Sequence, residues 1–273
     1  MYNKLLPVLP TGFGVYLSQE EFYSLTSYQI RMLAARRGFV LAKDVDFDDK
    51  NNFKTMVASY GNVVEYVGEK KKVGFGYKDV LELNGEKGKI VTGRGELSLH
   101  ADGGLLQTRV DIAFLYAVET RRMQFQGATT VCDHELAYQE MPIHLKKILD
   151  EEVFEYQVED KSYYVDASPD GWFKVPVYVD YGWCNKMLIY FPFTENNPPS
   201  WKSRVAGFSD KQSQMFFDEL KAHMTQQRYY YKHFWSKGDL LILDNRRTLH
   251  AREAYDEDSL RILYRGQTVD PEQ

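Results

Sequence analysis

The chain has 273 residues, of which 44% are hydrophobic and 27% are charged, a balance typical of a globular protein with a sizeable core. Its formal net charge is −5, with Lys and Arg spread among Asp and Glu, so it offers no basic stripe for nucleic-acid phosphates. The sequence contains no signal-peptide pattern and no apolar run of about 18 residues, which argues against a membrane partner. Its two cysteines, Cys132 and Cys184, form no disulfide pattern, and we interpret both as reduced thiols in the core. We therefore expect a cytoplasmic protein.

The N-terminal part, about residues 1–62, is predicted to be largely helical. Ser18 followed by Glu21 is a capping box, which marks the start of a helix. The expected elements are a helix over 19–37, a buried strand over 38–41 and a second helix over about 51–60.

The stretch from about 68 to 95 is rich in glycine and lysine and shows no regular apolar pattern. We interpret it as a long loop that could act as a lid, because strand-like sequence resumes directly after it.

The rest of the chain is dominated by short strand-like segments. This pattern predicts a β-sandwich or barrel of jelly-roll type with flanking helices. Without an internal repeat or a clear boundary, we expect a single domain over residues 1–273. The expected strands cover 112–118, 128–132, 239–245 and 260–269, with further strands within 151–193, and the expected helices cover 134–140, 142–150 and about 209–226.

Three side chains stand out as candidate metal ligands: His100, Asp102 and His250. Residues two apart on a strand point the same way, so His100 and Asp102 can hold one ion together. With His250 they would form a set of two histidines and one carboxylate that leaves open positions for a 2-oxo acid and O₂, as in non-haem Fe(II) oxygenases. The pair alone could also be a surface turn, since two glycines follow it.

Two arginines on the last predicted strand are candidate anion-binding residues. Arg261 and Arg265 share one face of that strand, and a guanidinium fork holds a carboxylate in two parallel bonds. The alternative is an outer strand with these arginines in water and the opposite face, carrying Ile262 and Tyr264, in the core.

At these residues the chain resembles the taurine dioxygenase-like (TauD/TfdA) family of Fe(II)/2-oxoglutarate dioxygenases. The matching segments are His-Ala-Asp at 100–102, Gly-Ala-Thr at 127–129 and WSKGDLLILDNRRTLHAR at 235–252, with Arg261 eleven residues after His250. The resemblance implies a double-stranded β-helix, a jelly-roll form in which strands carry the ligands into the barrel mouth.

The resemblance also implies roles for single residues. His100, Asp102 and His250 would bind Fe(II). Arg261 and Thr129 would hold the distal carboxylate of 2-oxoglutarate, and Thr130 matches the threonine position less well. O₂ would be the second co-substrate and succinate a product. Because Asp102 is present, hydroxylation, desaturation or a related C–H oxidation is expected rather than halogenation.

The substrate is predicted to be a small molecule with a free carboxylate. An arginine at the spacing of Arg265 binds the substrate's acidic group in the resembling family, and Glu96 lies four residues before His100. Together these charges would suit an amino acid derivative. The alternative is that Glu96 is a solvated loop residue and Arg265 a structural ion-pair partner.

Two other functions remain open at this stage. A jelly-roll binding protein that lost turnover would show a broken ligand set, and this set is intact. An isomerase-like enzyme of the same barrel with another divalent metal would not need Arg261. The sequence is also compatible with a homo-oligomer.

Overall fold

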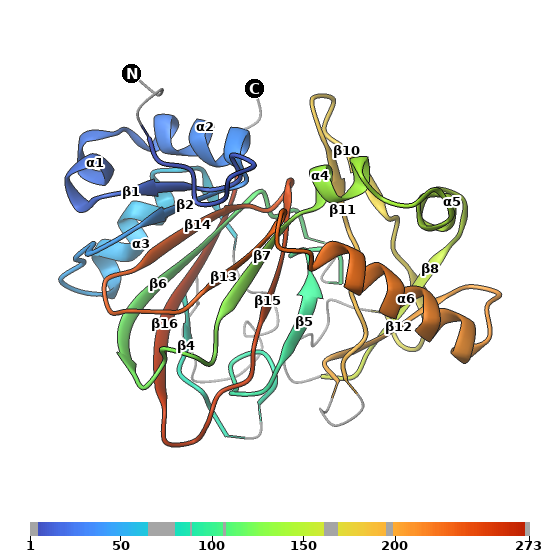
Figure 1. Ribbon diagram of the computed structural model, residues 1–273. Helices are drawn as coiled ribbons and strands as arrows, with labels where there is room; N and C mark the ends of the chain where they lie inside the picture. The colour runs from blue at the N-terminus through green and yellow to red at the C-terminus, as the bar shows by residue number, and fades with distance from the viewer. Residues whose placement is uncertain are drawn as a thin grey trace.

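The computed structural model describes residues 5–64, 80–87, 89–105, 108–160, 169–194 and 199–270. Its centre is a pair of β-sheets that face each other, with helices on both outer sides (Figure 1). This arrangement is the jelly-roll, double-stranded β-helix fold, which confirms the predicted fold class. No helix in these ranges is long and apolar enough to cross a membrane.

The larger sheet has seven strands in the order β1-β2-β14-β6-β16-β3, and β4 pairs with β16. Its inner strands are buried on both faces, which explains the nearly continuous apolar sequence of β14. The strands are β1 (Val15–Leu17), β2 (Phe39–Ala42), β3 (Asn62–Val63), β4 (Val80–Leu83), β6 (Ile112–Arg121), β14 (Leu240–Asp244) and β16 (Leu260–Val269).

The smaller sheet has four strands in the order β13-β7-β15-β5, and it carries both candidate histidine ligands. A third layer beside it contains a three-stranded sheet, β12-β8-β9, and the hairpin β10-β11. The strands are β5 (Leu97–His100), β7 (Thr129–Asp133), β13 (Tyr230–His233) and β15 (Thr248–Arg252), then β8 (Phe154–Val158), β9 (Phe173–Lys174), β10 (Tyr178–Asp180), β11 (Asn185–Met187) and β12 (Trp201–Val205).

The predicted helix over 19–37 is wrong in one respect, because the structure divides it into two helices. A second capping box, formed by Thr26 and Gln29, starts a new helix after the chain turns at Leu25. The other predicted helices are confirmed. The helices are α1 (Gln19–Ser24), α2 (Ser27–Arg37), α3 (Lys50–Ala58), α4 (His134–Gln139), α5 (Ile143–Glu151) and α6 (Asp210–Met224).

Two expectations about strands are also corrected. The loop predicted over 68–95 contains β4, whose residues pair with Leu263 to Gly266 of β16 and complete the larger sheet. Residues 68–79 of this predicted lid loop lie outside the described residues. The C-terminal region holds three strands rather than two, because along the chain β15, which carries His250, follows β14 and precedes β16.

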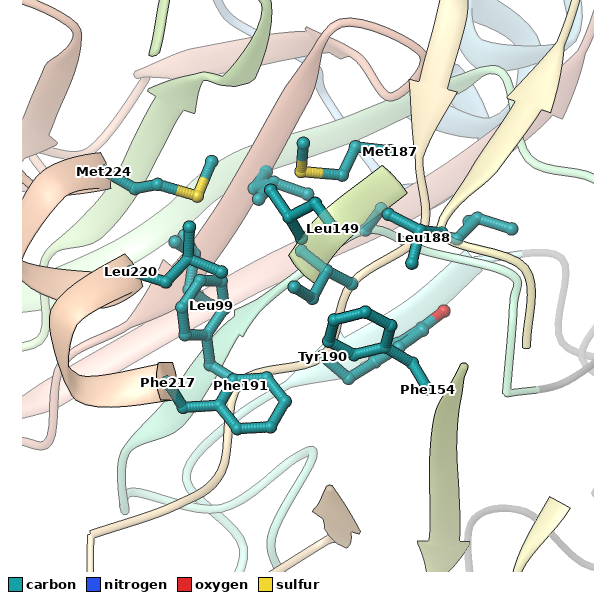
Figure 2. Close-up of a cluster of buried hydrophobic side chains, with 14 of the residues drawn as sticks. Leu99, Leu149, Phe154, Met187, Leu188, Tyr190, Phe191, Phe217, Leu220 and Met224 are labelled. Carbon is teal, nitrogen blue, oxygen red and sulfur yellow. The ribbon is translucent and has the colours of Figure 1, made fainter. Parts of the chain in front are cut away.

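One hydrophobic cluster anchors the smaller sheet to the helix α6. In Figure 2, Phe217, Leu220 and Met224 project from α6 toward Leu99 of β5. Alternation along β5 then turns His100 to the opposite face, between the two sheets. The packing of α6 therefore sets the direction of a candidate ligand.

We predict that Leu220→Ala lowers the free energy of unfolding by about 2–5 kcal/mol, because it removes a fully buried side chain from this cluster. Met215→Ala on the same helix is the matched control, since Met215 is exposed and should change stability by less than about 0.5 kcal/mol. Urea denaturation measures both values. Equal effects of the two substitutions would contradict this account of α6.

Candidate metal and co-substrate site

The two candidate histidine ligands meet because their strands are neighbours. His100 of β5 and His250 of β15 are directly opposite each other in an antiparallel pair. Their imidazole rings lie 4.5 Å apart, centre to centre. Asp102 follows β5 by two residues, so the short spacing of the His-x-Asp motif brings its carboxylate to the same place.

The three side chains form a compact buried cluster. Nε2 of His100 lies 3.7 Å from one carboxylate oxygen of Asp102, and Nε2 of His250 lies 3.5 Å from the other. One potential ligand atom from each residue falls within 4.8 Å of the other two. Ligand atoms about 2.1 Å from one ion and at right angles to each other would lie about 3 Å apart, so small side-chain shifts suffice to hold a divalent metal.

Hydrogen bonding and burial prepare both imidazoles as ligands. Nδ1 of His100 donates to the backbone carbonyl of Ser98 at 2.7 Å, which leaves the lone pair of Nε2 directed at the cluster. Burial lowers the pKa of His250 to about 3, so this ring is neutral at physiological pH. Neutral imidazoles are the form that binds metal.

Asp102 is oriented by two donors from the opposite sheet. Arg265 donates to Oδ1 at 2.5 Å and Gln267 donates to Oδ2 at 2.6 Å, both from β16. Burial alone would raise the pKa of Asp102, but the charge of Arg265, with His250 and His100 nearby, holds that pKa well below its usual range. The carboxylate is therefore ionised and fixed.

The backbone at Asp102 is held equally firmly. The side chain of Asn245 accepts from the Asp102 amide at 2.9 Å and donates to the carbonyls of Asp102 and Val110. Lys186 donates to the same two carbonyls at 2.9 and 2.8 Å. Gly103 follows with φ +105°, and an added Cβ would lie 2.1 Å from the carbonyl oxygen of Thr108, so this loop requires glycine.

A buried arginine with unused donors lies in the same pocket. Arg261 of β16 donates from Nη2 to Oγ1 of Thr129 at 2.9 Å, and Trp235 donates to that same oxygen at 3.0 Å. Nε and Nη1 of Arg261 are buried without a hydrogen-bond partner, and burial lowers its pKa to about 9. Such a group is poised to receive a carboxylate. Side chains from both sheets line this pocket: Leu83, Val91, Leu97, His100, Ala113, Leu115, Thr129, Leu243, His250, Ala251, Arg252, Arg261 and Arg265.

The alternation predicted for the last strand is present, and its arginine face is the inner one. Arg261, Leu263 and Arg265 are buried, whereas Ile262 and Tyr264 are only partly buried on the other face. The alternative reading, with the arginines in water, is therefore wrong.

Glu96, the other predicted substrate residue, takes partners away from the metal ligands. Lys221 of α6 approaches its carboxylate at 3.4 Å, and the Thr194 hydroxyl donates to it at 3.1 Å. The substrate role of Glu96 stays a prediction.

Three other histidines have partners away from the candidate metal ligands. His134 and His223 bond to the backbone carbonyls of Arg246 and Ala137, and His144 pairs with Glu219 at the surface. Among the described residues, the only group of His, Cys, Asp and Glu side chains close enough to share a metal is His100, Asp102 and His250.

Sequence reasoning missed Gln267 and Lys186 as residues that hold Asp102. Gln267 could have been found, because it continues the inner face of the strand that carries Arg261 and Arg265. Lys186 could not, because its contacts are to backbone carbonyls more than 70 residues away.

Comparison with known proteins gives a family match over most of the chain. Residues 7–267 match the model of the "Taurine catabolism dioxygenase TauD, TfdA family". Two curated relatives match over short segments. The α-ketoglutarate-dependent 2,4-dichlorophenoxyacetate dioxygenase of Cupriavidus pinatubonensis is 40% identical over 68 residues, and pentalenolactone F synthase of Streptomyces arenae is 33% identical over 60 residues. These matches cover 25% and 22% of this chain and only 24% and 20% of the relatives.

Solved structures match over nearly the whole fold. PvcB from Pseudomonas aeruginosa superposes with a TM-score of 0.73 at 20% identity, covering 97% of this chain and 91% of that structure. AAD-2, solved with Mn(II) and N-oxalylglycine, superposes with a TM-score of 0.69 at 15% identity, covering 98% and 97%. At these identities the similarity establishes the fold alone.

We predict that His100→Ala, Asp102→Ala and His250→Ala each weaken binding of a divalent metal by more than about 100-fold. Changing residues that only orient a ligand typically weakens affinity by about 10- to 100-fold, and loss of a ligand should exceed this. Anaerobic titration with Mn(II), followed by water proton relaxation, measures the affinity. His144→Ala, at the exposed histidine, is the control. A variant of the three that keeps wild-type affinity would remove its residue from the ligand set.

Proposed function

Because the chain belongs to the TauD/TfdA family, we propose that it is an Fe(II)- and 2-oxoglutarate-dependent oxygenase that oxidises a C–H bond of a small molecule. One observation carries the proposal: two histidines of a buried set of two histidines and a carboxylate line the same pocket as Arg261, a buried arginine that has unused donors. His100, Asp102 and His250 would hold the iron. When bound, the iron with 2-oxoglutarate and O₂ supplies the oxidising power.

Arg261 and Thr129 bind the far carboxylate of 2-oxoglutarate in this proposal. Nε and Nη1 of Arg261 are unpartnered, so a planar carboxylate can bind in two parallel bonds on either edge of the guanidinium, Nε with Nη2 or Nη1 with Nη2, and the Thr129 hydroxyl can add a third donor. Trp235 fixes the threonine side chain and lies beside the guanidinium, 5.6 Å from it to the ring centre. The co-substrate would therefore be oriented before chemistry begins.

The chain keeps the reacting groups dry and the metal-binding carboxylate in place. Apolar side chains of the larger sheet, such as Leu115 and Leu243, form the wall opposite the histidines.

Asp102 occupies the position where halogenating relatives carry a small residue, so hydroxylation, desaturation or a related oxidation is proposed.

Two other functions account for less of this site. A binding protein without turnover would not need three intact ligands with a fixed tautomer at His100. An isomerase with another metal would leave the buried charge of Arg261 without a purpose. The carboxylate on the substrate, the cytoplasmic location, the single-domain organisation and a homo-oligomeric state stay predictions.

We predict that Arg261→Ala weakens 2-oxoglutarate binding by about 30-fold to several thousand-fold, because a buried charge-assisted pair is lost. Metal affinity should remain at the wild-type level, since Arg261 contacts Thr129 and Trp235 rather than the ligands. Anaerobic calorimetry on the metal-loaded protein measures both affinities.

The matched control is Arg252→Ala. Arg252 lines the same pocket, but its guanidinium donates to the backbone carbonyls of Ile90, Val91 and Gly95. It should change 2-oxoglutarate affinity by less than Arg261→Ala does. Equal affinity in wild type and Arg261→Ala would contradict the co-substrate assignment.

A further inference from the structure

A cavity of about 720 Å³ opens directly beside the metal-ligand loop. Its wall includes Gly103 and Gly104, the residues that follow Asp102, and the hairpin β10-β11 closes the other side. This volume lies within the usual range of about 300–1,000 Å³ for small-molecule sites. It is a separate space from the pocket that contains Arg261, so co-substrate and substrate need not compete for room.

The lining of this cavity combines an apolar body with an excess of positive charge. Val175, Val179 and Leu188 contribute apolar surface, and Tyr181 adds an aromatic ring. The charged lining residues are Lys174, Arg109, Lys186 and a single acid, Asp180.

The three cations differ in how far their charge is already neutralised. Arg109 forms a two-pronged pair with Asp111, from Nε to Oδ1 at 3.1 Å and from Nη2 to Oδ2 at 2.9 Å, and Lys174 is exposed to water. Lys186 is only 3% exposed, and its ammonium bonds to two neutral backbone carbonyls. Within the described residues no carboxylate lies within ion-pair distance of it.

A buried ammonium with neutral partners attracts an anion. An ammonium has three N–H donors, and two of those of Lys186 are used by the carbonyls of Asp102 and Val110. The described residues give the remaining donor no partner, and the Lys186 side chain is part of the cavity wall. Asp102, Asp111 and Asp244 act on Lys186 only from beyond ion-pair distance, so an anion in the cavity would form the closest pair, and burial makes that pair stronger than one at the surface.

Arg265, the cation expected from the sequence to bind the substrate acid, differs from Lys186 because it already has a carboxylate partner. Its guanidinium already donates to the carboxylate of Asp102 at 2.5 Å. Arg265 is therefore paired directly with a carboxylate, whereas Lys186 has no carboxylate at ion-pair distance among the described residues.

Building on the proposed function, we propose that this cavity is the substrate site and that Lys186 binds the substrate's acidic group. The substrate class is a carboxylic acid with an apolar or aromatic body, held by Lys186 on one side and by Tyr181 and the apolar wall on the other. Because Lys186 also bonds to the carbonyl of Asp102, the acid would be anchored close to the metal ligands.

A pair of matched probes tests this proposal without turnover. 3-Phenylpropionate and its neutral amide, 3-phenylpropionamide, differ in charge but hardly in shape. Their affinities are measured by NMR on the Mn(II)-loaded full chain, without O₂ and with saturating 2-oxoglutarate, which blocks the Arg261 pocket. We expect the acid to bind at least about tenfold more tightly than the amide, and bound Mn(II) to broaden its signals.

Variants assign the preference to one cation. Lys186→Gln keeps N–H donors for the two carbonyls but removes the charge, so the acid-to-amide preference should fall to about one, while Lys186→Arg should retain most of it. Arg109→Gln is the control at the rim and should retain the preference. A purely structural role of Lys186 would not change this ratio.

Several results would overturn the proposal. They are an unchanged preference in Lys186→Gln, a loss of preference in Arg265→Gln alone, or no acid binding by the wild type up to about 10 mM. If Lys186→Gln fails to fold, Val179→Trp fills the cavity from its wall and should weaken acid binding at least about tenfold; unchanged binding overturns the proposal. Failure of 2-oxoglutarate to bind would instead overturn the proposed function.

Discussion

The site depends on one register, the antiparallel pairing that places His100 directly opposite His250. A shift of one residue between β5 and β15 would turn one imidazole to the other face of the sheet and separate the ligands. The register is stabilised from outside by the cluster in which Leu99 packs with α6 (Figure 2). A hydrophobic contact on the outer face thus helps to fix the positions of the proposed metal ligands on the inner face.

The larger sheet completes the site, because side chains of its strand β16 reach residues of the smaller sheet and of the loop after β5. Arg265 and Gln267 of β16 reach Asp102, and Arg261 of the same strand reaches Thr129 of β7. One strand of the larger sheet therefore supplies contacts for the proposed metal-binding carboxylate and for the proposed co-substrate site. The facing sheets of a jelly roll provide this arrangement, because inward side chains from both sheets meet between them.

Much of the site was predictable, and the reasons are local. His100 and Asp102 are two residues apart, and Arg261 and Arg265 alternate with outward residues on one strand, so periodicity alone groups each pair. Adding His250 to this group rested on ligand chemistry and on the family resemblance, since spacing along one strand cannot join residues so far apart in the sequence. The strand around His250 was missed because it is short and carries two polar residues, Thr248 and Arg252, that tertiary contacts bury. The hydrogen bonds from Lys186 to the carbonyls of Asp102 and Val110 could not be predicted from the sequence, because every residue offers the same backbone groups.

The central claim is that these three ligands and Arg261 form one working centre for iron and 2-oxoglutarate. The most direct measurement is anaerobic addition of Fe(II) and 2-oxoglutarate to the whole protein, with the visible charge-transfer absorption of the iron–oxo-acid chelate recorded. The account predicts that this band appears in the wild type, is absent in His250→Ala, and requires much more 2-oxoglutarate in Arg261→Ala. A wild-type protein that binds Fe(II) but never develops the band would contradict the account.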